Sequence, residues 1–228
     1  MKQRILVGLA LLAGAAIVAR GLRKDRRRQR RRRRAPGGPG VQTQVDAARL
    51  LVIRGAFDNV SVRAGDGPGI GIHAFGVASL ENALCVHRDD DRGRVTLQLH
   101  PRRRVDVTVP RGTGVRLELA KSSGRIQGVD DVDVRCAKVR VALADVGGAI
   151  RVRGAKGEFD VGLSRDRETR SVDVDLAKAR FWLDLPAGRG GAYSIEAAKA
   201  SVSAPPSVEG GIPVHIRAAK ARIAIHAA

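Results

Sequence analysis

Aromatic residues are scarce in this chain of 228 residues, which contains one Trp, one Tyr and four Phe. A hydrophobic core must therefore consist mainly of Val, Ile, Leu and Ala, which suit thin and closely stacked layers. No aromatics are interleaved with the basic residues near the N-terminus, where stacking on nucleic-acid bases would require them. The composition allows a folded domain but gives little support for base recognition.

Cysteines and catalytic motifs are equally scarce. Cys85 and Cys136 are too few for a disulfide framework and lack the spacing of metal ligands. The chain has no phosphate-binding glycine loop and no nucleophile elbow, and its five histidines are scattered. Cys136 occupies an inward strand position, which predicts a small core residue, and reduced thiols fit a cytoplasmic location. We expect no cofactor, no metal site and no enzymatic activity.

Only one long apolar run is present, at residues 5–19, with two basic residues before it and eleven after it in the first 34 residues. Its fifteen residues fall short of the about 17 to 25 of most membrane spans, but Gly21, Leu22 and snorkelling arginines can extend it. Residues 1–22 are therefore predicted to form an uncleaved membrane anchor. The positive-inside rule predicts a cytoplasmic C-terminal domain, with export to the cell surface as the alternative.

Positive charge is concentrated in the N-terminal arm. The net charge is +19, and residues 1–34 hold 13 Lys or Arg against one Asp, whereas the rest of the chain holds 29 basic and 22 acidic residues. Residues 23–40 are predicted to be a polybasic juxtamembrane segment followed by a Pro/Gly linker. We expect anionic lipid to contact eight of its arginines, which are Arg26, Arg27, Arg28, Arg30, Arg31, Arg32, Arg33 and Arg34. Nucleic-acid binding by this arm, driven by phosphate, is the less favoured alternative.

The dominant feature of the C-terminal half is a repeat centred on Ala-Lys. Six copies occur, with separations of 17 to 22 residues. Apolar or small residues alternate on both sides of each dipeptide, as in Val172, Val174 and Leu176 before it and Phe181 and Leu183 after it. This alternation predicts strands with one buried face, and the dipeptide shifts the phase by one residue. Each copy is therefore predicted to form two short strands that meet at a corner.

Stacking of these repeats in parallel register is predicted from the outward positions. One column would hold Arg116, Asp133, Arg151, Asp173, Ser194 and His215, whose first four members alternate in sign. A second would hold Arg140, Glu158 and Arg180, which alternate again, as neighbouring strands prefer. Asp173 and Asp175 would then be neutralised by neighbouring arginines, so they provide no evidence for a catalytic carboxylate pair. Residues 111–228 are predicted to be a β-solenoid of about six short coils.

The lysines of the repeat would form a column of like charge, called the lysine column below: Lys121, Lys138, Lys156, Lys178, Lys199 and Lys220. One interpretation is that Lys is a soluble corner residue whose stem shields the neighbouring Ala. The other is that the column is a cationic stripe that binds an extended anion, such as a polysaccharide. The lysine column is the candidate binding site of the domain.

Residues 41–110 continue the β pattern and are predicted to cap the solenoid. Their expected strands are 50–54, 60–64, 70–75, 83–88, 94–100 and 105–109, with a hairpin loop at 89–93. The sequence Val105-Asp-Val-Thr-Val-Pro110, followed by Gly112 and Val115 and then by short coils with Gly-rich returns, resembles the bacterial putative-adhesin domain family over about residues 50–228. The resemblance implies a single-stranded β-solenoid, or β-helix, of a family without established function.

We therefore expect an all-β, membrane-anchored and non-enzymatic β-solenoid that acts as a binding or scaffolding module at the membrane surface. The layout of an N-terminal membrane segment before a short solenoid is also similar to that of bactofilin filament proteins. The alternative is therefore a self-assembling filament or homo-oligomer that forms through an uncapped C-terminal coil at residues 214–225. A carbohydrate-active enzyme is the least favoured alternative, with Trp182 as the one outward residue that could stack on a sugar.

Overall fold

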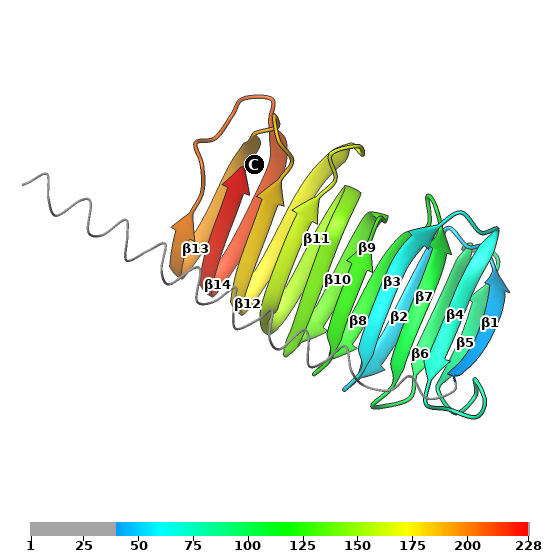
Figure 1. Cartoon of the computed structure of the whole chain (residues 1–228). Helices are drawn as coiled ribbons and strands as arrows, with labels where there is room; N and C mark the ends of the chain where they lie inside the picture. Colours follow the sequence, from blue (N-terminus) through cyan, green and yellow to red (C-terminus); the bar gives the residue numbers. More distant parts are fainter. Residues whose placement is uncertain (1–39, 228) are drawn as a thin grey trace, which may run out of the picture. The chain divides into compact units, whose positions relative to one another are not determined.

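The computed structural model describes residues 40–227, which form one 14-stranded β-sheet (Figure 1). The strands are β1 (Gly40–Asp46), β2 (Leu50–Ala56), β3 (Asn59–Gly65), β4 (Gly69–Phe75), β5 (Leu84–Asp89), β6 (Arg94–Leu99), β7 (Arg104–Pro110), β8 (Gly114–Ala120), β9 (Ser123–Gln127), β10 (Asp130–Ala137), β11 (Val139–Leu163), β12 (Thr169–Leu185), β13 (Gly191–Ser203) and β14 (Ile212–Ala227). The all-β prediction is confirmed. The six strands expected between residues 50 and 109 are all present, and only β1 was not predicted.

Within residues 40–227 no helix is long and apolar enough to cross a membrane. The anchor predicted at residues 1–22 lies outside the described residues. The polybasic segment and linker predicted at residues 23–40 also lie outside them, apart from Gly40, which begins β1.

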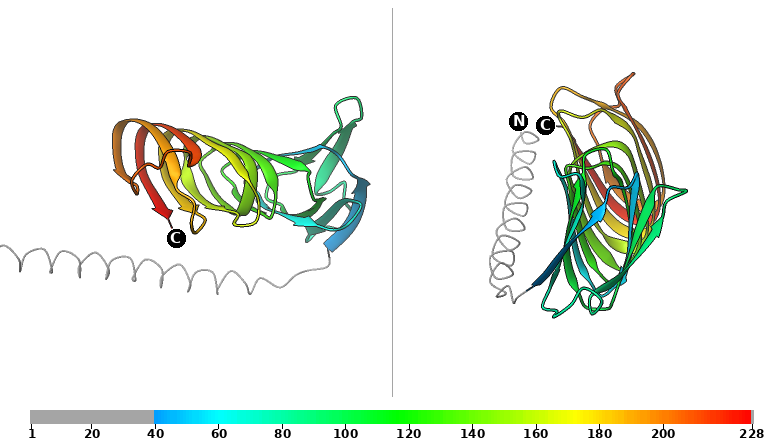
Figure 2. Two further views of the ribbon diagram at one scale, coloured as in Figure 1. Left: turned by 90° about the horizontal axis from the view of Figure 1, so that it is seen from above. Right: turned by 90° about the vertical axis from the view of Figure 1, so that its right-hand side faces the viewer.

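The sheet is curled, so that two arms enclose the core between them (Figure 2). One arm contains β5, β6, β2, β8, β10 and the middle of β11, and the other contains β1, β4, β7, β3, β9 and the first part of β11. The long strands β12 and β14 pair along both arms, because residues 172–176 and 178–185 of β12 have partners in register in β14. Most pairs are parallel, and antiparallel pairs occur only where β1, β4, β7, β5 and β6 meet at the N-terminal end.

The corner at Ala-Lys has the geometry that the sequence pattern predicts. In β12, Ala177 and Lys178 are both exposed, whereas Leu176 before them and Ala179 after them are buried. The inward face is thereby kept on both sides of the dipeptide. Lys121 and Lys138 interrupt the strands and hold positive φ angles of 52° and 56°, a left-handed conformation that bends the chain sharply.

The order of strands at the C-terminal end differs from the order in the sequence. β14 lies between β12 and β13 and pairs with both in parallel register, which leaves one edge of β13 without a strand neighbour among the described residues (Figure 1). The prediction that residues 214–225 form the uncapped end is therefore wrong, because β14 has a strand neighbour on both sides. Self-assembly itself is not tested by this strand order and stays a prediction. The connection at 204–211 leads from the end of β13 to the start of β14, which lies between β12 and β13.

Side-chain burial explains this order. β14 contains four large aliphatic residues on its inward face, Val214, Ile216, Ile223 and Ile225, and each is 3% exposed or less. β13 is poorer in such residues, and its Val202 is 45% exposed. Because burial of apolar surface stabilises the fold by about 25 cal/mol per Å², the more apolar strand is favoured in the interior position.

A similar exchange occurs at the N-terminal end. β2 and β3 pair with β8 and β9 on one side and with β6 and β7 on the other, although β6 and β7 follow them in the sequence. Beyond β7, the antiparallel strands β4 and β1 continue the second arm. An ion pair joins the two arms at this end, because the guanidinium of Arg88 in β5 lies 2.5 Å from the carboxylate of Asp46 in β1.

The core is mainly aliphatic, as the composition predicts, and two Phe residues are its largest fully buried side chains. Phe159 of β11 and Phe181 of β12 are partners in register. Gly154 provides the space for the first of them, since a Cβ at that position would lie 2.8 Å from Cζ of Phe159. The absence of a side chain at Gly154, before the corner, therefore makes room for Phe159 after it.

Candidate functional site

The strand register brings the lysine column together at one corner of the curled sheet. Ala120 pairs with Ala137, and Lys156 pairs with Lys178, which pairs with Lys220. Lys220 in turn pairs with Lys199. The spatial order is therefore Lys121, Lys138, Lys156, Lys178, Lys220 and Lys199, so the column is continuous although its last two members are exchanged relative to the sequence.

Every member of the lysine column is exposed. Among residues 40–227 all the ion pairs are made by Arg or His, so no carboxylate lies within 4.0 Å of these six ammonium groups. Neighbouring strands are about 4.8 Å apart, where two exposed like charges repel by about 1 kcal/mol in water and flexible stems can diverge. The column is thus a tolerated line of uncompensated positive charge.

Phe57 extends this corner beyond Lys121, and sequence reasoning missed it. Its neighbour Ala56 pairs with Ala120, and its own N–H donates to the carbonyl of Ala120 at 2.9 Å. The ammonium of Lys121 lies 4.8 Å from the centroid of its ring, which is a cation–π contact. The signal was present in the sequence, because Arg54-Gly-Ala-Phe57 matches Arg153-Gly-Ala-Lys156 at three of four positions.

The outward column on one arm alternates in charge as predicted. Asp133 pairs in register with Arg116 on one side and Arg151 on the other, and Arg151 pairs with Asp173. The carboxylate of Asp133 is 2.9 Å from the guanidinium of Arg116 and 3.0 Å from that of Arg135. The last two members are exchanged relative to the sequence, because His215 lies between Asp173 and Ser194.

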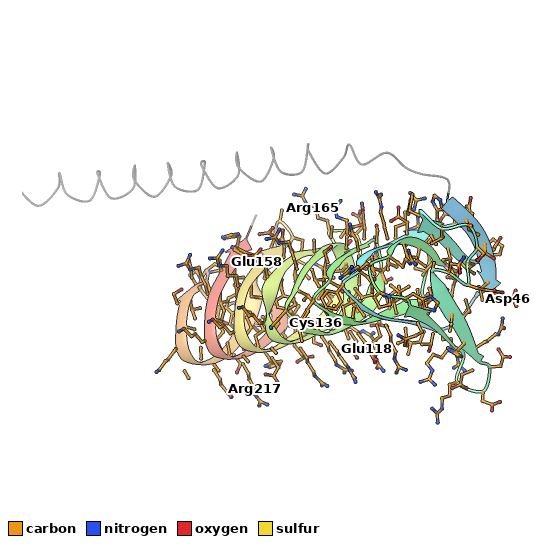
Figure 3. All side chains as sticks on the ribbon, turned by 90° about the horizontal axis from the view of Figure 1, so that it is seen from below. Asp46, Glu118, Cys136, Glu158, Arg165 and Arg217 are labelled. Atoms are coloured by element: carbon orange, nitrogen blue, oxygen red, sulfur yellow. The ribbon has the colours of Figure 1, made fainter. Side chains whose placement is uncertain are left out.

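A second column on the same arm was missed as a whole, although its Arg153 and Asp175 were predicted to be neighbours and are. Its spatial order is Arg54, Glu118, Arg135, Arg153, Asp175, Arg217 and Glu196. Arg54 is 2.7 Å from Glu118 at one end, and Arg217 is 3.3 Å from Glu196 at the other. Figure 3 shows Glu118 and Arg217 along the same side of the sheet and Arg165 on the opposite side.

On the other arm, the predicted column of Arg140, Glu158 and Arg180 is confirmed. Glu158 lies 2.6 Å from the guanidinium of Arg140 and 3.5 Å from that of Arg180. Acidic residues therefore neutralise much of the outward positive charge on both arms. The lysine column, at the corner between the arms, differs from these outward columns in containing no acidic residue.

An open pocket of about 560 Å³ lies away from the lysine column, over the second arm. It is lined by Arg125, Asp160, Asp184 and Arg165, among others. Desolvation and the charge of Asp184 raise the pKa of Asp160, and Asp184 accepts a hydrogen bond from Nδ1 of His226 at 3.0 Å when that nitrogen is protonated. Trp182 pairs with Asp160 in register and is half-buried at an outward position, as predicted.

The two thiols differ in environment. Cys136 packs against the core, and burial raises the pKa of its thiol to about 12. This confirms the predicted inward position at the margin of the core, where Cys136 is partly buried, and a thiol with such a pKa is inert at neutral pH. Cys85 is exposed on β5 with its sulfur 3.7 Å from Nε2 of His100. The eight arginines predicted to contact lipid, at positions 26 to 34, lie outside the described residues.

Comparison with known proteins gives structural similarity only. No protein-family model matches the chain. No curated protein matches it either. Among solved structures, a "putative cell adhesion protein" from Clostridium sporogenes is 14% identical, with a TM-score of 0.45 and coverage of 83% of this chain and 99% of that one. A "putative adhesin" from Bacteroides fragilis is 8% identical, with a TM-score of 0.40 and coverage of 82% and 96%.

A third structure, a "putative lipid binding protein" from Parabacteroides distasonis, is 9% identical, with a TM-score of 0.36 and coverage of 84% of this chain and 98% of that one. The adhesin names of the first two structures coincide with the family that the sequence resembles.

Proposed function

We propose that residues 40–227 are a β-solenoid that serves as a non-enzymatic binding module, with the lysine column as its contact surface for an extended anion. The observation that carries the proposal is the uncompensated charge of this one column. The outward columns beside it contain alternating or paired charges, whereas its six lysines have no carboxylate within 4.0 Å in the described part of the chain.

The spacing of the column suits a linear ligand. Six strands about 4.8 Å apart place the lysines along a line of about 24 Å, which matches several units of a charged polysaccharide or a row of lipid headgroups. Lys presents a mobile ammonium on a flexible stem, so it adapts to anions of varied spacing better than a rigid guanidinium does. Phe57 and the small exposed alanines of the Ala-Lys pairs provide little apolar surface beside the column, so electrostatic attraction dominates recognition.

The N-terminal arm supplies the localisation in this proposal. Residues 1–22 anchor the chain in a membrane, and the arginines at positions 26 to 34 contact anionic lipid, as the sequence pattern predicts. The domain then faces the cytoplasm beside the membrane. A charged polysaccharide and a row of lipid headgroups share one chemistry, which is that of a polyanion with regularly spaced charges.

The test is binding of a heparin oligosaccharide, a linear sulfated probe, to the full chain in neutral detergent micelles. The eight arginines of the arm are replaced by Gln in every sample, so that the arm does not bind the probe. Replacing Lys156, Lys178 and Lys220 by Gln should weaken binding on the order of one hundredfold, at about 1 kcal/mol for each cation lost. The salt dependence of the dissociation constant should become shallower as well.

A matched control removes the same charge elsewhere. Arg102, Arg165 and Arg189 are exposed and make no ion pair among residues 40–227, so replacing them by Gln changes the net charge equally. If both triple variants weaken binding to the same extent, net charge and not the lysine column recognises the probe, and the proposal fails. Vesicles containing anionic lipid, tested with the same variants, distinguish a headgroup ligand from a free polysaccharide.

A further inference from the structure

The two ends of the curled sheet differ in how they are capped. At the N-terminal end, antiparallel strands complete the arms, and Leu80, Ala83 and Leu84 pack on the core. At the other end, β13 is the last strand of the row, and its outer edge has no strand neighbour among residues 40–227 (Figure 1). Its inward residues Ile195 and Val202 are partly exposed, whereas their partners Ile216 and Ile223 in β14 are each 1% exposed.

Such an edge presents unpaired N–H and C=O groups beside exposed apolar side chains, which favours addition of another strand. We infer that β13 is an interface at which a second copy of this chain docks head to head, by antiparallel pairing of β13 with β13 around a two-fold axis. This inference is independent of anion binding, because it rests on the outer edge of β13 and not on the lysine column.

The symmetry of β13 about its corner makes this pairing self-complementary. The corner lies between Ala198 and Lys199, so a two-fold axis through it superimposes the corner of one copy on that of the other. Inward residues then face inward residues, with Ile195 opposite Val202 and Ala197 opposite Ala200. The two-fold axis runs along the bisector of the corner. In the second copy it reverses the direction of each strand, which makes the pairing antiparallel, and it reverses the direction in which the strands are stacked, which makes the contact head to head.

The outward positions contain no opposed like charges in this arrangement. Ser194 lies opposite Ser203, and Glu196 lies opposite Ser201 and diagonal to Lys199 of the second copy, within reach of its long side chain. If β14 were the terminal strand, the same symmetry would place Arg217 opposite Arg222, twice in each dimer. Because β14 lies inside the row, β13 is the terminal strand, and β13 can pair with itself without placing like charges opposite each other.

Disulfide trapping tests both the contact and its register in the full chain, solubilised in detergent with Cys85 replaced by Ser. The double substitution Ser194→Cys and Ser203→Cys should give a covalent dimer under mild oxidation, because directly opposed residues have Cβ atoms about 5 Å apart. The control, Ser194→Cys and Ser201→Cys, places the thiols about 7 to 8 Å apart across the interface and should cross-link poorly. Equal cross-linking of both pairs would overturn the proposed register.

A charge reversal provides the second measurement, by sedimentation velocity of the full chain. Ser201→Glu places a carboxylate opposite Glu196 of the second copy, twice in each dimer, and should weaken dimerisation about tenfold or more. In the folded monomer this position pairs with Arg222, so the substitution is compatible with the fold. Adding Glu196→Lys should restore the dimer. A wild-type protein that stays monomeric at its highest soluble concentration, or a double variant that dimerises no better than Ser201→Glu alone, would refute the inference.

Discussion

The ammonium nitrogen of Lys121 lies 4.8 Å from the centroid of the Phe57 ring, and both residues hold left-handed backbone conformations, with φ angles of 52° and 65°. They occupy equivalent corner positions on adjacent strands, one as a cation and the other as an aromatic. The corner is therefore a property of the backbone at this position, and the side chain that it presents can vary.

The first prediction compares two lysines with the same sequence context but different backbones. Lys138 holds a φ of 56°, whereas Lys178 lies within continuous β12 and has no positive φ. A left-handed conformation costs a non-Gly residue about 1 kcal/mol, so Lys138→Gly should raise the free energy of unfolding by up to that amount. Lys178→Gly should lower it by about 0.5 to 1 kcal/mol, because Gly weakens a strand interior. Urea denaturation of the two variants measures both values, and a loss of equal size in both would show that the strain at Lys138 is negligible.

The second prediction concerns the alternating charges. Asp133 is 15% exposed and contacts Arg116 and Arg135, with Arg151 as its neighbour in register. Its replacement by Asn leaves the guanidinium groups of Arg116 and Arg135 without their shared anion and should cost about 1 to 2 kcal/mol of unfolding free energy. Glu196 contacts Arg217 with both side chains at least 69% exposed, so Glu196→Gln should cost less than about 0.5 kcal/mol. Chemical denaturation in low and high salt distinguishes the two cases, and a similar small effect at both sites would contradict the stabilising role of Asp133.

A third prediction uses the buried carboxyl of Asp58, which is 4% exposed. Its Oδ1 accepts a hydrogen bond from the N–H of Arg103 at 2.8 Å, while its Oδ2 has no hydrogen-bond partner within the described part of the chain. Burial raises the pKa of Asp58, against the opposing effect of the backbone N–H groups of Arg103, Ala56 and Arg102. A carboxyl with a raised pKa stabilises the fold at low pH, and that contribution is lost as the pH rises through the pKa of the folded state.

Asp58→Asn should therefore raise the melting temperature at neutral pH, because the amide retains an acceptor for the N–H of Arg103 and carries no buried charge. The gain should shrink as the pH falls toward about 4, the ordinary pKa of Asp. Thermal unfolding across this pH range measures the difference, with Asp66→Asn as the control at an exposed carboxylate. A gain that is the same at both pH values, or a loss at neutral pH, would show that the ionised carboxylate is not a cost to the folded state.

Sequence reasoning predicted the features that depend on residue spacing. The alternation around each Ala-Lys pair fixed the inward and outward faces, and the charges at equivalent positions fixed the register of Asp133 with Arg116 and Arg151. The lysine column followed from the same register. Local spacing is sufficient here, because a one-residue slip would move every inward side chain to the outside.

The stacking order could not be obtained in this way. Separations of 21 residues allow β14 to lie on either side of β13, because both positions preserve the same register along the strands. The choice depends on the total apolar surface that each order buries, which is a property of the assembled stack. Phe57 was missed for a related reason, since its copy of the repeat lies about sixty residues before the others and has lost its Lys.

The last prediction tests the exchanged order of β13 and β14 directly, by amide hydrogen exchange. β14 is flanked by β12 and β13, and most of its residues have a partner in register on both sides. In the monomer, at concentrations below those of dimerisation, β13 pairs only with β14 among residues 40–227, so the N–H groups on its outer edge should exchange fast. The amides of residues 212–225 should therefore be protected more strongly than those of residues 191–203.

Deleting residues 204–228 provides the complementary measurement, since β13 then loses its partner and should lose protection altogether. Stacking in sequence order predicts the reverse on both counts, with β13 well protected and the C-terminal strand as the one that exchanges first.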